Sequence, residues 1–251
     1  MNGDRSYWDG WFADQRSHPA KDALHRRHLG LPPDLAVNNL VPLHGIDEIA
    51  DELRVGVGDT FLDLACGRGG VGLRIAARTG AGLIGHDISS VAVDIARARA
   101  AEMARTSTLS AAFAVTDMTS TGLEDDAVDA VMCIDAPQFA DPVDLGRELA
   151  RVIRPGGRVV LTGWQAAVTG DPAVPEKLRE LDLASLLRDA GFDEVCVREP
   201  TSWLEAEHAM WHEAAELNLG DDPALRSFVA EGRRAVERWG SLRRVFATAS
   251  R

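Results

Sequence analysis

Between residues 56 and 163 the chain alternates short runs of mostly apolar residues with longer segments in which apolar residues return every three or four positions. The short runs predict strands and the longer segments predict helices, because side chains repeat every two residues in a strand and about every 3.6 in a helix. The expected strands are 60–65, 82–86, 110–116, 128–134 and 157–163, and the expected helices are 71–78, 91–105 and 142–153. This order is typical of a doubly wound α/β fold, a parallel sheet with helices on both faces.

The two flanks of this region have a different pattern. Residues 1–55 predict helices and loops, with Trp8, Trp11 and Phe12 spaced to share one helix face. After the fifth strand, the pattern predicts a helix at 181–190, a strand at 194–197, helices at about 203–218 and 223–239 with a break at 220–222, and a last strand at 244–248. We therefore expect a single domain over 1–251, divided into an N-terminal helical lid (1–55), a core (56–202), a helical insertion (203–240) and a last strand (241–251).

Composition narrows the class of partner. The net charge of −12 opposes binding to nucleic acid or to anionic membranes, because clustered Lys and Arg supply most of the affinity for phosphates. The apolar runs are shorter than the roughly 18 to 20 residues of a membrane helix, and the first residues lack the pattern of a secretory signal. Three scattered cysteines indicate neither a zinc site nor a disulfide framework. We expect a cytoplasmic protein with a small neutral or cationic ligand.

The segment FLDLACGRGG, at 61–70, reads as a buried strand that runs into a glycine turn. Gly67, Gly69 and Gly72 have the G-x-G-x-x-G spacing of a loop that holds a dinucleotide pyrophosphate on a helix N-terminus. Asp63, four residues before the first of these glycines, suits that anionic ligand poorly. A carboxylate beside permissive glycines fits a ligand with a positive end, such as S-adenosylmethionine with its ammonium and sulfonium.

The next two strands also end in acids. Asp87 follows Gly67 by 20 residues, the spacing at which a carboxylate accepts the hydroxyls of an adenosine ribose. Asp117 and Met118 follow the third strand and supply an acceptor for an adenine amino group and an apolar neighbour for its ring. Three successive strands that end in acids favour S-adenosylmethionine over NAD.

These segments resemble, in order, the motifs of class I S-adenosylmethionine-dependent methyltransferases. The matching stretches are 63–70 (DLACGRGG), 85–89 (GHDIS), 116–118 (TDM), 133–136 (CIDA) and 151–158 (RVIRPGGR). The resemblance covers roughly residues 40 to 165, and the flanks look like the small-molecule branch that tailors natural products. It implies a Rossmann-like, mostly parallel sheet of seven strands with a helical N-terminal lid and a two-helix insertion before the last strand.

The resemblance also implies roles for individual residues. Asp63 and the backbone around Ala65 and Gly67 would hold the methionine part of the cofactor, and Asp87 would bind the ribose. Asp135 would border the methyl-transfer site. For the adenine, the residues implied are Ile88 and Met118 on either side of the ring and Asp117 at the amino group.

The predicted helix at 203–218 carries the candidates for a general base that would deprotonate the acceptor. His208, Trp211 and His212 fall at i, i+3 and i+4, so one helix face presents two imidazoles and an indole. An imidazole with a pKa near 6.5 can take a proton at neutral pH, so His208 and His212 are the catalytic candidates, with packing at the edge of the core as the alternative. Related enzymes often carry a histidine after the fourth strand, where this chain has Gln138.

The sequence thus predicts an enzyme that moves a methyl group from S-adenosylmethionine to an O, N or C atom of a small-molecule acceptor, in secondary metabolism. Two alternatives stay open: an NAD(P)-dependent oxidoreductase, and an S-adenosylmethionine-binding protein without turnover. No metal, nucleic-acid or membrane partner is expected, and a homodimer is left open.

Overall fold

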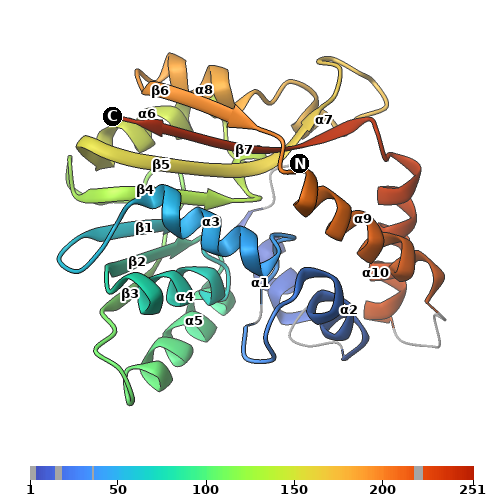
Figure 1. The fold of residues 1–251 in the computed structure, drawn as a ribbon, viewed down its shortest axis with the longest axis horizontal. Coiled ribbons are helices and arrows are strands. Elements are labelled where there is room, and N and C mark those ends of the chain that lie inside the picture. The colour runs from blue at the N-terminus through green and yellow to red at the C-terminus, as the bar shows by residue number, and fades with distance from the viewer. Residues whose placement is uncertain (1–3, 15–18, 36, 218–222) are drawn as a thin grey trace.

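A computed structural model describes residues 4–14, 19–35, 37–217 and 223–251 of the chain. Its centre is a seven-stranded sheet in the order β3-β2-β1-β4-β5-β7-β6 (Figure 1). The strands are β1 (Thr60–Leu64), β2 (Gly82–Asp87), β3 (Ala111–Val115), β4 (Val128–Ile134), β5 (Ile153–Ala166), β6 (Asp193–Arg198) and β7 (Leu242–Ser250). β7 is antiparallel to both of its neighbours, and the pairs among β1 to β5 are parallel. The predicted doubly wound, mostly parallel fold is confirmed.

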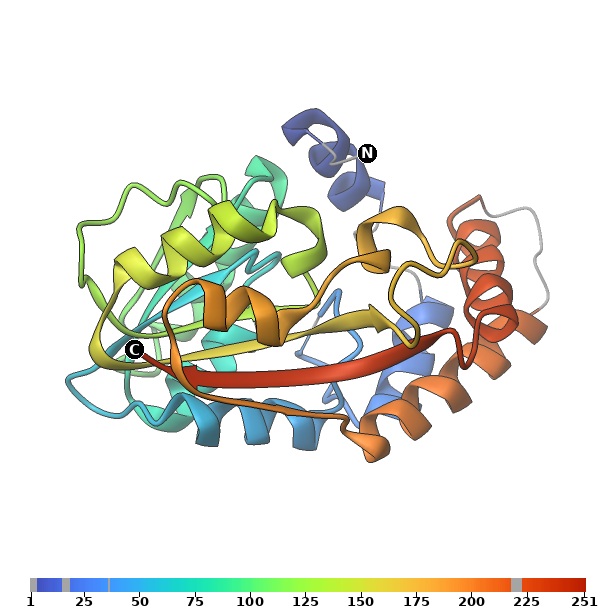
Figure 2. The same cartoon turned by 90° about the horizontal axis from the view of Figure 1, so that it is seen from above.

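Helices cover both faces of the sheet (Figure 2). They are α1 (Arg5–Asp14), α2 (Pro19–Leu29), α3 (Leu43–Leu53), α4 (Gly70–Thr79), α5 (Ser90–Met103), α6 (Pro142–Val152), α7 (Glu176–Arg179), α8 (Leu183–Asp189), α9 (Thr201–Glu216) and α10 (Pro223–Glu237), with a 3-10 turn η1 at Pro137–Phe139. None of the described helices is both long and apolar enough to span a membrane. The predicted break at 220–222 lies outside the described residues.

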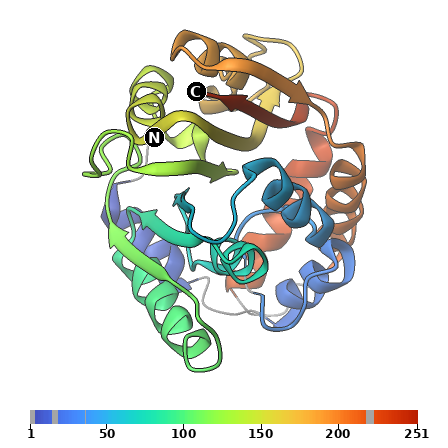
Figure 3. The ribbon, with the colours of Figure 1, turned by 60° about the vertical axis from the view of Figure 1, so that its left-hand side comes forward.

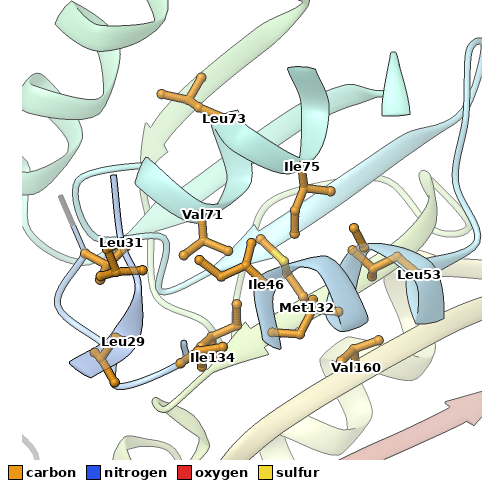
Figure 4. Packing of buried hydrophobic residues seen from close by; sticks show 14 of the residues in the cluster. Leu29, Leu31, Ile46, Leu53, Val71, Leu73, Ile75, Met132, Ile134 and Val160 are labelled. Carbon is orange, nitrogen blue, oxygen red and sulfur yellow. The ribbon is translucent and has the colours of Figure 1, made fainter. Parts of the chain in front are cut away.

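Two apolar clusters, one on each face, hold the layers together. Along β1, Phe61 joins the cluster of α3, α4 and α5, whereas Leu62 and Leu64 join that of α6 and α8. Figure 4 shows the first cluster, in which Ile46 of α3 lies close to Met132 of β4. Apolar side chains on both faces explain why the strands are nearly continuous apolar runs, as expected for a parallel sheet buried between helices.

Both predicted bounds of the fifth strand were wrong, because β5 runs from Ile153 to Ala166. The sequence places the fifth strand at 157–163, after a glycine turn, but β5 begins at Ile153, directly after α6. Gly156 takes a positive φ of 79° and its N–H bonds to the carbonyl oxygen of Arg251. The turn residues are therefore part of an extended strand that pairs with the C-terminal residue.

The sheet topology determines where a ligand can bind. β1 and β4 lie side by side at the centre, although 63 residues of chain separate the end of one from the start of the other, and β3 and β6 form the two edges (Figure 3). The strand order therefore reverses between β1 and β4. In open α/β sheets, the crevice at such a reversal, beyond the carboxyl ends of the strands, is the usual ligand site.

Candidate functional site

A cavity of about 760 Å³ opens at this edge of the sheet. Pockets of roughly 300 to 1,000 Å³ accommodate cofactors and drug-sized ligands. Its wall is built by the segments that follow β1, β2, β3 and β4, and by α1, α9 and α10. The residues predicted for the cofactor that line it are Ala65, Gly67, Asp87, Ile88, Asp117, Met118 and Asp135. The cavity thus brings together seven of the eight cofactor residues that the sequence singled out.

The glycine loop forms the floor of the cavity after β1. Ala65 and Gly67 both adopt positive φ, 57° and 52°, which turns the chain sharply away from the strand. The Phe12 ring of α1 lies next to Gly67, and a Cβ at Gly67 would be 3.5 Å from the Cζ atom of that ring. A Cβ at Gly69 would come within 2.9 Å of the Ala96 Cβ on α5. The loop therefore needs glycine both for its backbone angles and for its close packing.

Asp87, at the end of β2, ties the glycine loop to the adjacent strand. Its Oδ2 accepts the N–H of Gly67 and its Oδ1 accepts the N–H of Ser89, each at 2.8 Å. The side chain lines the cavity and is 6% exposed. Burial raises the pKa of Asp87, and the two backbone donors partly oppose that rise. Each oxygen keeps a second lone pair, which leaves the carboxylate able to accept ligand hydroxyls.

Asp63 occupies a different position from the other predicted acids. It is buried in β1 behind the glycine loop and is absent from the described residues that line the cavity. Burial, with the nearby charge of Asp87, raises its pKa well above the usual range, and a bond from the Gly72 amide opposes this. A Cβ at Gly72 would lie 2.7 Å from its Oδ2. Asp63 thus supports the loop from behind, and its role toward the methionine stays a prediction.

The residues that follow β3 lie on the cavity wall, as the sequence predicted. Asp117 and Met118 line the cavity together with Ile88 from the segment after β2. The Oδ1 of Asp117 accepts the backbone N–H of Thr119 at 2.8 Å and its hydroxyl at 2.7 Å. These bonds fix an exposed carboxylate at the rim, beside two partly buried apolar side chains. Their roles toward adenine stay predictions.

Asp135, after β4, is paired with a buried arginine that the sequence analysis did not single out. Its Oδ1 lies 2.6 Å from Nη1 of Arg244, and its Oδ2 accepts Nη2 at 2.8 Å. Thr162 Oγ1 donates to Oδ1 at 2.7 Å, and the N–H of Leu40 donates to Oδ2 at 3.1 Å. The Arg244 guanidinium also lies against the Trp164 and Trp203 rings. This ion pair joins the end of β4 to β7 through two residues that are 109 positions apart in the sequence.

The two predicted catalytic histidines are not on the cavity wall. His208 is half-buried and His212 is exposed, and their Nε2 atoms lie 2.8 Å apart. The His208 ring also packs against Trp239, with ring centroids 4.1 Å apart. Burial, followed by the neighbouring His212, lowers the pKa of His208. Their catalytic role stays a prediction that this placement does not support.

The inward face of α9 instead carries Glu207, which the sequence analysis missed. Glu207 and Trp211 line the cavity, and the indole Nε1 of Trp211 donates to Oε1 of Glu207 at 3.1 Å. Glu207 is 2% exposed, and burial raises its pKa to about 8. A usable signal was the spacing: Glu207 falls four residues after Trp203 and four before Trp211, on their side of the helix.

Aromatic rings form much of the remaining wall. Those that line the cavity are Tyr7, Trp8, Trp11, Phe12, Phe139, Trp164, Trp211 and Trp239. Trp8 meets Phe139 edge to face, with centroids 4.9 Å apart, so α1 contacts η1. The cavity therefore has two parts, a polar part around Gly67 and Asp87 and an aromatic part around Trp164, Trp211 and Trp239.

Five buried polar atoms of residues on the cavity wall have no hydrogen-bond partner among the described residues. They are Asn38 Nδ2, His86 Nδ1, Thr116 Oγ1, Gln138 Oε1 and Glu207 Oε2. An unpaired buried polar group costs roughly 1 to 3 kcal/mol, so a polar ligand that paired with these atoms would recover that cost. No group of three or more His, Cys, Asp and Glu residues suited to a metal ion occurs in the described part of the chain.

Comparison with known proteins shows that part of this chain is similar to methyltransferases. Residues 61–157 match the family described as "Methyltransferase domain". The chain is 31% identical over 147 residues to the Synechocystis 2-methyl-6-phytyl-1,4-hydroquinone methyltransferase, which covers 57% of this chain and 45% of that enzyme. It is 29% identical over 184 residues to the ubiquinone/menaquinone biosynthesis C-methyltransferase UbiE of Acidiphilium cryptum, covering 61% of this chain and 73% of that one. The match thus spans less than half of the Synechocystis enzyme.

Solved structures share the fold over almost the whole chain. The [4+2]-cyclase SpnF aligns with a TM-score of 0.76 at 22% identity, covering 99% of this chain and 97% of that one. Phosphoethanolamine N-methyltransferase 2 of Haemonchus contortus aligns with a TM-score of 0.73 at 18% identity, covering 94% of this chain and 58% of that one. At these identities the likeness concerns the fold alone.

Proposed function

We propose that the chain transfers a methyl group from S-adenosylmethionine to a small-molecule acceptor, because residues 61–157 match a methyltransferase domain. The observation that carries the proposal is the single cavity in which Gly67, Asp87 and Asp117 share a wall with a ring of aromatic side chains. A cofactor part and an acceptor part side by side are what a direct transfer between two bound molecules requires.

The residues of the polar part fit the cofactor. Gly67 lets the backbone approach the amino-acid end of the ligand, and Asp87 has lone pairs for the ribose hydroxyls. Asp117 would accept the adenine amino group, with Ile88 and Met118 beside the ring. The unpartnered Thr116 Oγ1 and His86 Nδ1 add polar atoms that a nucleoside would satisfy.

When bound, S-adenosylmethionine supplies an already activated methyl group on a sulfonium. The protein then contributes alignment and the exclusion of water, and well-oriented reactants gain effective molarities worth roughly 7 to 11 kcal/mol. Asp135 holds its position on the cavity wall through Arg244 and Thr162. Trp8, Trp11 and Phe139 line the cavity with apolar rings, which would help to exclude water from the reacting atoms.

The aromatic part favours an acceptor with a flat, apolar body. The Trp164, Trp211 and Trp239 side chains on its wall can bind rings and hydrocarbon through burial and edge-to-face contacts. The Synechocystis relative is named for a prenylated hydroquinone, an acceptor with both features. We therefore propose a neutral or weakly polar ring-bearing metabolite as the acceptor, methylated at O, N or C, in secondary metabolism. The predicted cytoplasmic location and the open question of a homodimer stay with this proposal.

One observation supports a second function. SpnF, named as a [4+2]-cyclase, shares the fold over 99% of this chain, so a protein of this fold need not be a methyltransferase. On this alternative, the cavity binds the cofactor without methyl transfer. The NAD(P)-dependent oxidoreductase is not favoured, because the core matches a methyltransferase family.

Calorimetric titration with S-adenosylhomocysteine tests the cofactor half of the proposal. We expect micromolar binding to the native protein and a loss of at least about tenfold in Asp87→Asn, because removing the charge of a carboxylate weakens its bonds to Gly67 and to ribose hydroxyls. The matched control is Asp94→Asn, a change at an exposed aspartate on α5, which should bind like the native protein.

The same titration with NAD and NADP should give no heat of binding. Binding of either dinucleotide in place of S-adenosylhomocysteine would overturn the proposal. A screen of ring-bearing acceptors for transfer of a labelled methyl group then separates a methyltransferase from a cofactor-binding protein without this activity.

A further inference from the structure

Glu207 combines three properties that set it apart from the other acids of the cavity wall. It is almost fully buried, its Oε2 has no hydrogen-bond partner among the described residues, and it belongs to the wall of the aromatic part. Its other oxygen is fixed by the Trp211 indole, so the carboxyl group is oriented and one of its two oxygens remains free. A buried polar atom that is left free beside a cavity marks the place where a ligand atom can bind.

The charged groups around Glu207 come from several elements. Arg244 of β7 favours its ionised form, while Asp135 after β4 and Glu231 of α10 disfavour it. On α2, which packs against α9, burial lowers the pKa of His25 to about 3, so that imidazole is neutral. Burial dominates these effects and raises the pKa of Glu207 to about 8. At neutral pH the side chain is therefore mainly a carboxylic acid, which donates through its hydroxyl and accepts through its carbonyl oxygen.

Resting on the methyltransferase function proposed above, we propose that Glu207 binds the polar atom of the acceptor, a hydroxyl or carbonyl oxygen on its ring. A group that both donates and accepts is complementary to a phenolic hydroxyl, which also does both. The surrounding Trp164, Trp211 and Trp239 take the ring, so a single acid sets the orientation of an otherwise apolar ligand.

The other ionisable residues considered for the acceptor are less suited to this role. Both oxygens of Asp135 are already engaged by Arg244, Thr162 and Leu40. His208 and His212 are not on the cavity wall and hydrogen-bond to each other. Unlike these three residues, Glu207 both belongs to the cavity wall and keeps unused hydrogen-bonding capacity.

A pair of probes that differ by one hydroxyl tests this assignment. The affinities of 1-naphthol and naphthalene are measured by calorimetry, with and without saturating S-adenosylhomocysteine. The native protein should prefer 1-naphthol by about three- to tenfold, the range of a single net hydrogen bond. Glu207→Leu should bind the two probes equally, whereas Glu207→Gln, whose amide donates and accepts, should keep the preference.

Matched changes on the outer face of the same helix are the control. Glu205 is exposed on α9, and Glu205→Leu and Glu205→Gln should both keep the native preference. Thermal melts check that each variant folds. If Glu207→Leu does not fold, the measurement is repeated with Glu207→Met, whose side chain is unbranched. A preference that survives in both Glu207→Leu and Glu207→Met, or is missing in the native protein, overturns the assignment.

The two proposals fail in distinguishable ways. If S-adenosylhomocysteine binds but the 1-naphthol preference does not depend on Glu207, only the role of Glu207 is overturned. If S-adenosylhomocysteine does not bind but the preference disappears in Glu207→Leu, the methyltransferase proposal is overturned while Glu207 keeps its role in binding a polar ring.

Discussion

At the scale of single residues, several carboxyl groups at or behind the cavity wall are buried at a cost to the stability of the folded protein. Burial raises the pKa of Asp63, Asp87 and Glu207, which means that each is less stable as a carboxylate in the folded protein than in water. For Asp87, backbone donors partly offset this cost. For Glu207, the Trp211 indole is the one hydrogen-bond donor to the carboxyl group among the residues that the structure describes. Such costs are typical of residues retained for binding or catalysis.

Glu207 should make the free energy of unfolding depend on pH. A carboxyl whose pKa is raised from about 4.3 to about 8 binds more protons in the folded state between these values, so it lowers the free energy of unfolding as pH rises through this window. Glu207→Gln has no proton to lose. We expect the variant to gain stability over the native protein between pH 5 and pH 9, by up to a few kcal/mol.

Urea unfolding at pH 5, 7 and 9 measures this difference. Glu205→Gln, at an exposed position on the same helix, should follow the native protein at every pH. If the difference between the native protein and Glu207→Gln is the same at all three values, Glu207 does not titrate as its burial implies.

At the scale of elements, α3 and α9 meet through a glycine. The Trp203 side chain is fully buried and its Nε1 donates to Oε1 of Glu48 at 3.2 Å. A Cβ at Gly45 would lie 2.5 Å from the Trp203 ring and 2.8 Å from Val41. This close approach seats the first turn of α9, and the rest of that helix then carries Glu207 and Trp211 to the cavity.

Gly45→Ala should therefore destabilise the protein. Overpacking a dense interface costs roughly 1 to 3 kcal/mol, and the better helix propensity of alanine returns up to about 1 kcal/mol of that. We expect a net loss of about 1 to 2 kcal/mol in the free energy of unfolding, measured with urea. Gly10→Ala on α1, where no atom lies within 4 Å of the added Cβ, should be neutral or slightly stabilising. Equal stability of the two variants would contradict the close packing at Gly45.

At the scale of the whole molecule, the cavity is closed by segments from both ends of the chain. α1 reaches the sheet edge and is held there by Asp9, which accepts the hydroxyls of Ser89 and Ser90 and the N–H of Val91 at the start of α5. The bond from Ser89 is the largest of the effects that lower the pKa of Asp9. On the other side, α9 and α10 cover the aromatic part.

Asp9→Asn should loosen α1 without unfolding the core. The amide is a weaker acceptor than the carboxylate, and Phe12 is the only residue of α1 that is buried. We expect faster hydrogen exchange at residues 5–14, a severalfold loss of affinity for S-adenosylhomocysteine, and a free energy of unfolding within about 0.5 kcal/mol of the native value. Asp14→Asn, at an exposed position on the same helix, is the control. Unchanged exchange in Asp9→Asn would mean that other contacts hold α1.

The sequence by itself determined the order and type of the core elements and the loop residues at the carboxyl ends of β1 to β4. These follow from local periodicity and from turn chemistry, which involve residues close together in the chain. Asp87 and Asp117 could be named because the end of each parallel strand must reach the same edge of the sheet, whereas Asp135 was named through the resemblance to class I methyltransferases.

Only the tertiary structure decided which side chains face the cavity and which charges are paired. Asp63 follows the same strand pattern as the other acids but lies behind the loop, and His208 and His212 share a helix with the buried Glu207 yet lie off the cavity wall. Arg244 forms an ion pair with Asp135, which is 109 positions away in the sequence. Burial and ion pairing depend on what packs across an element from distant parts of the chain, and no local pattern encodes that.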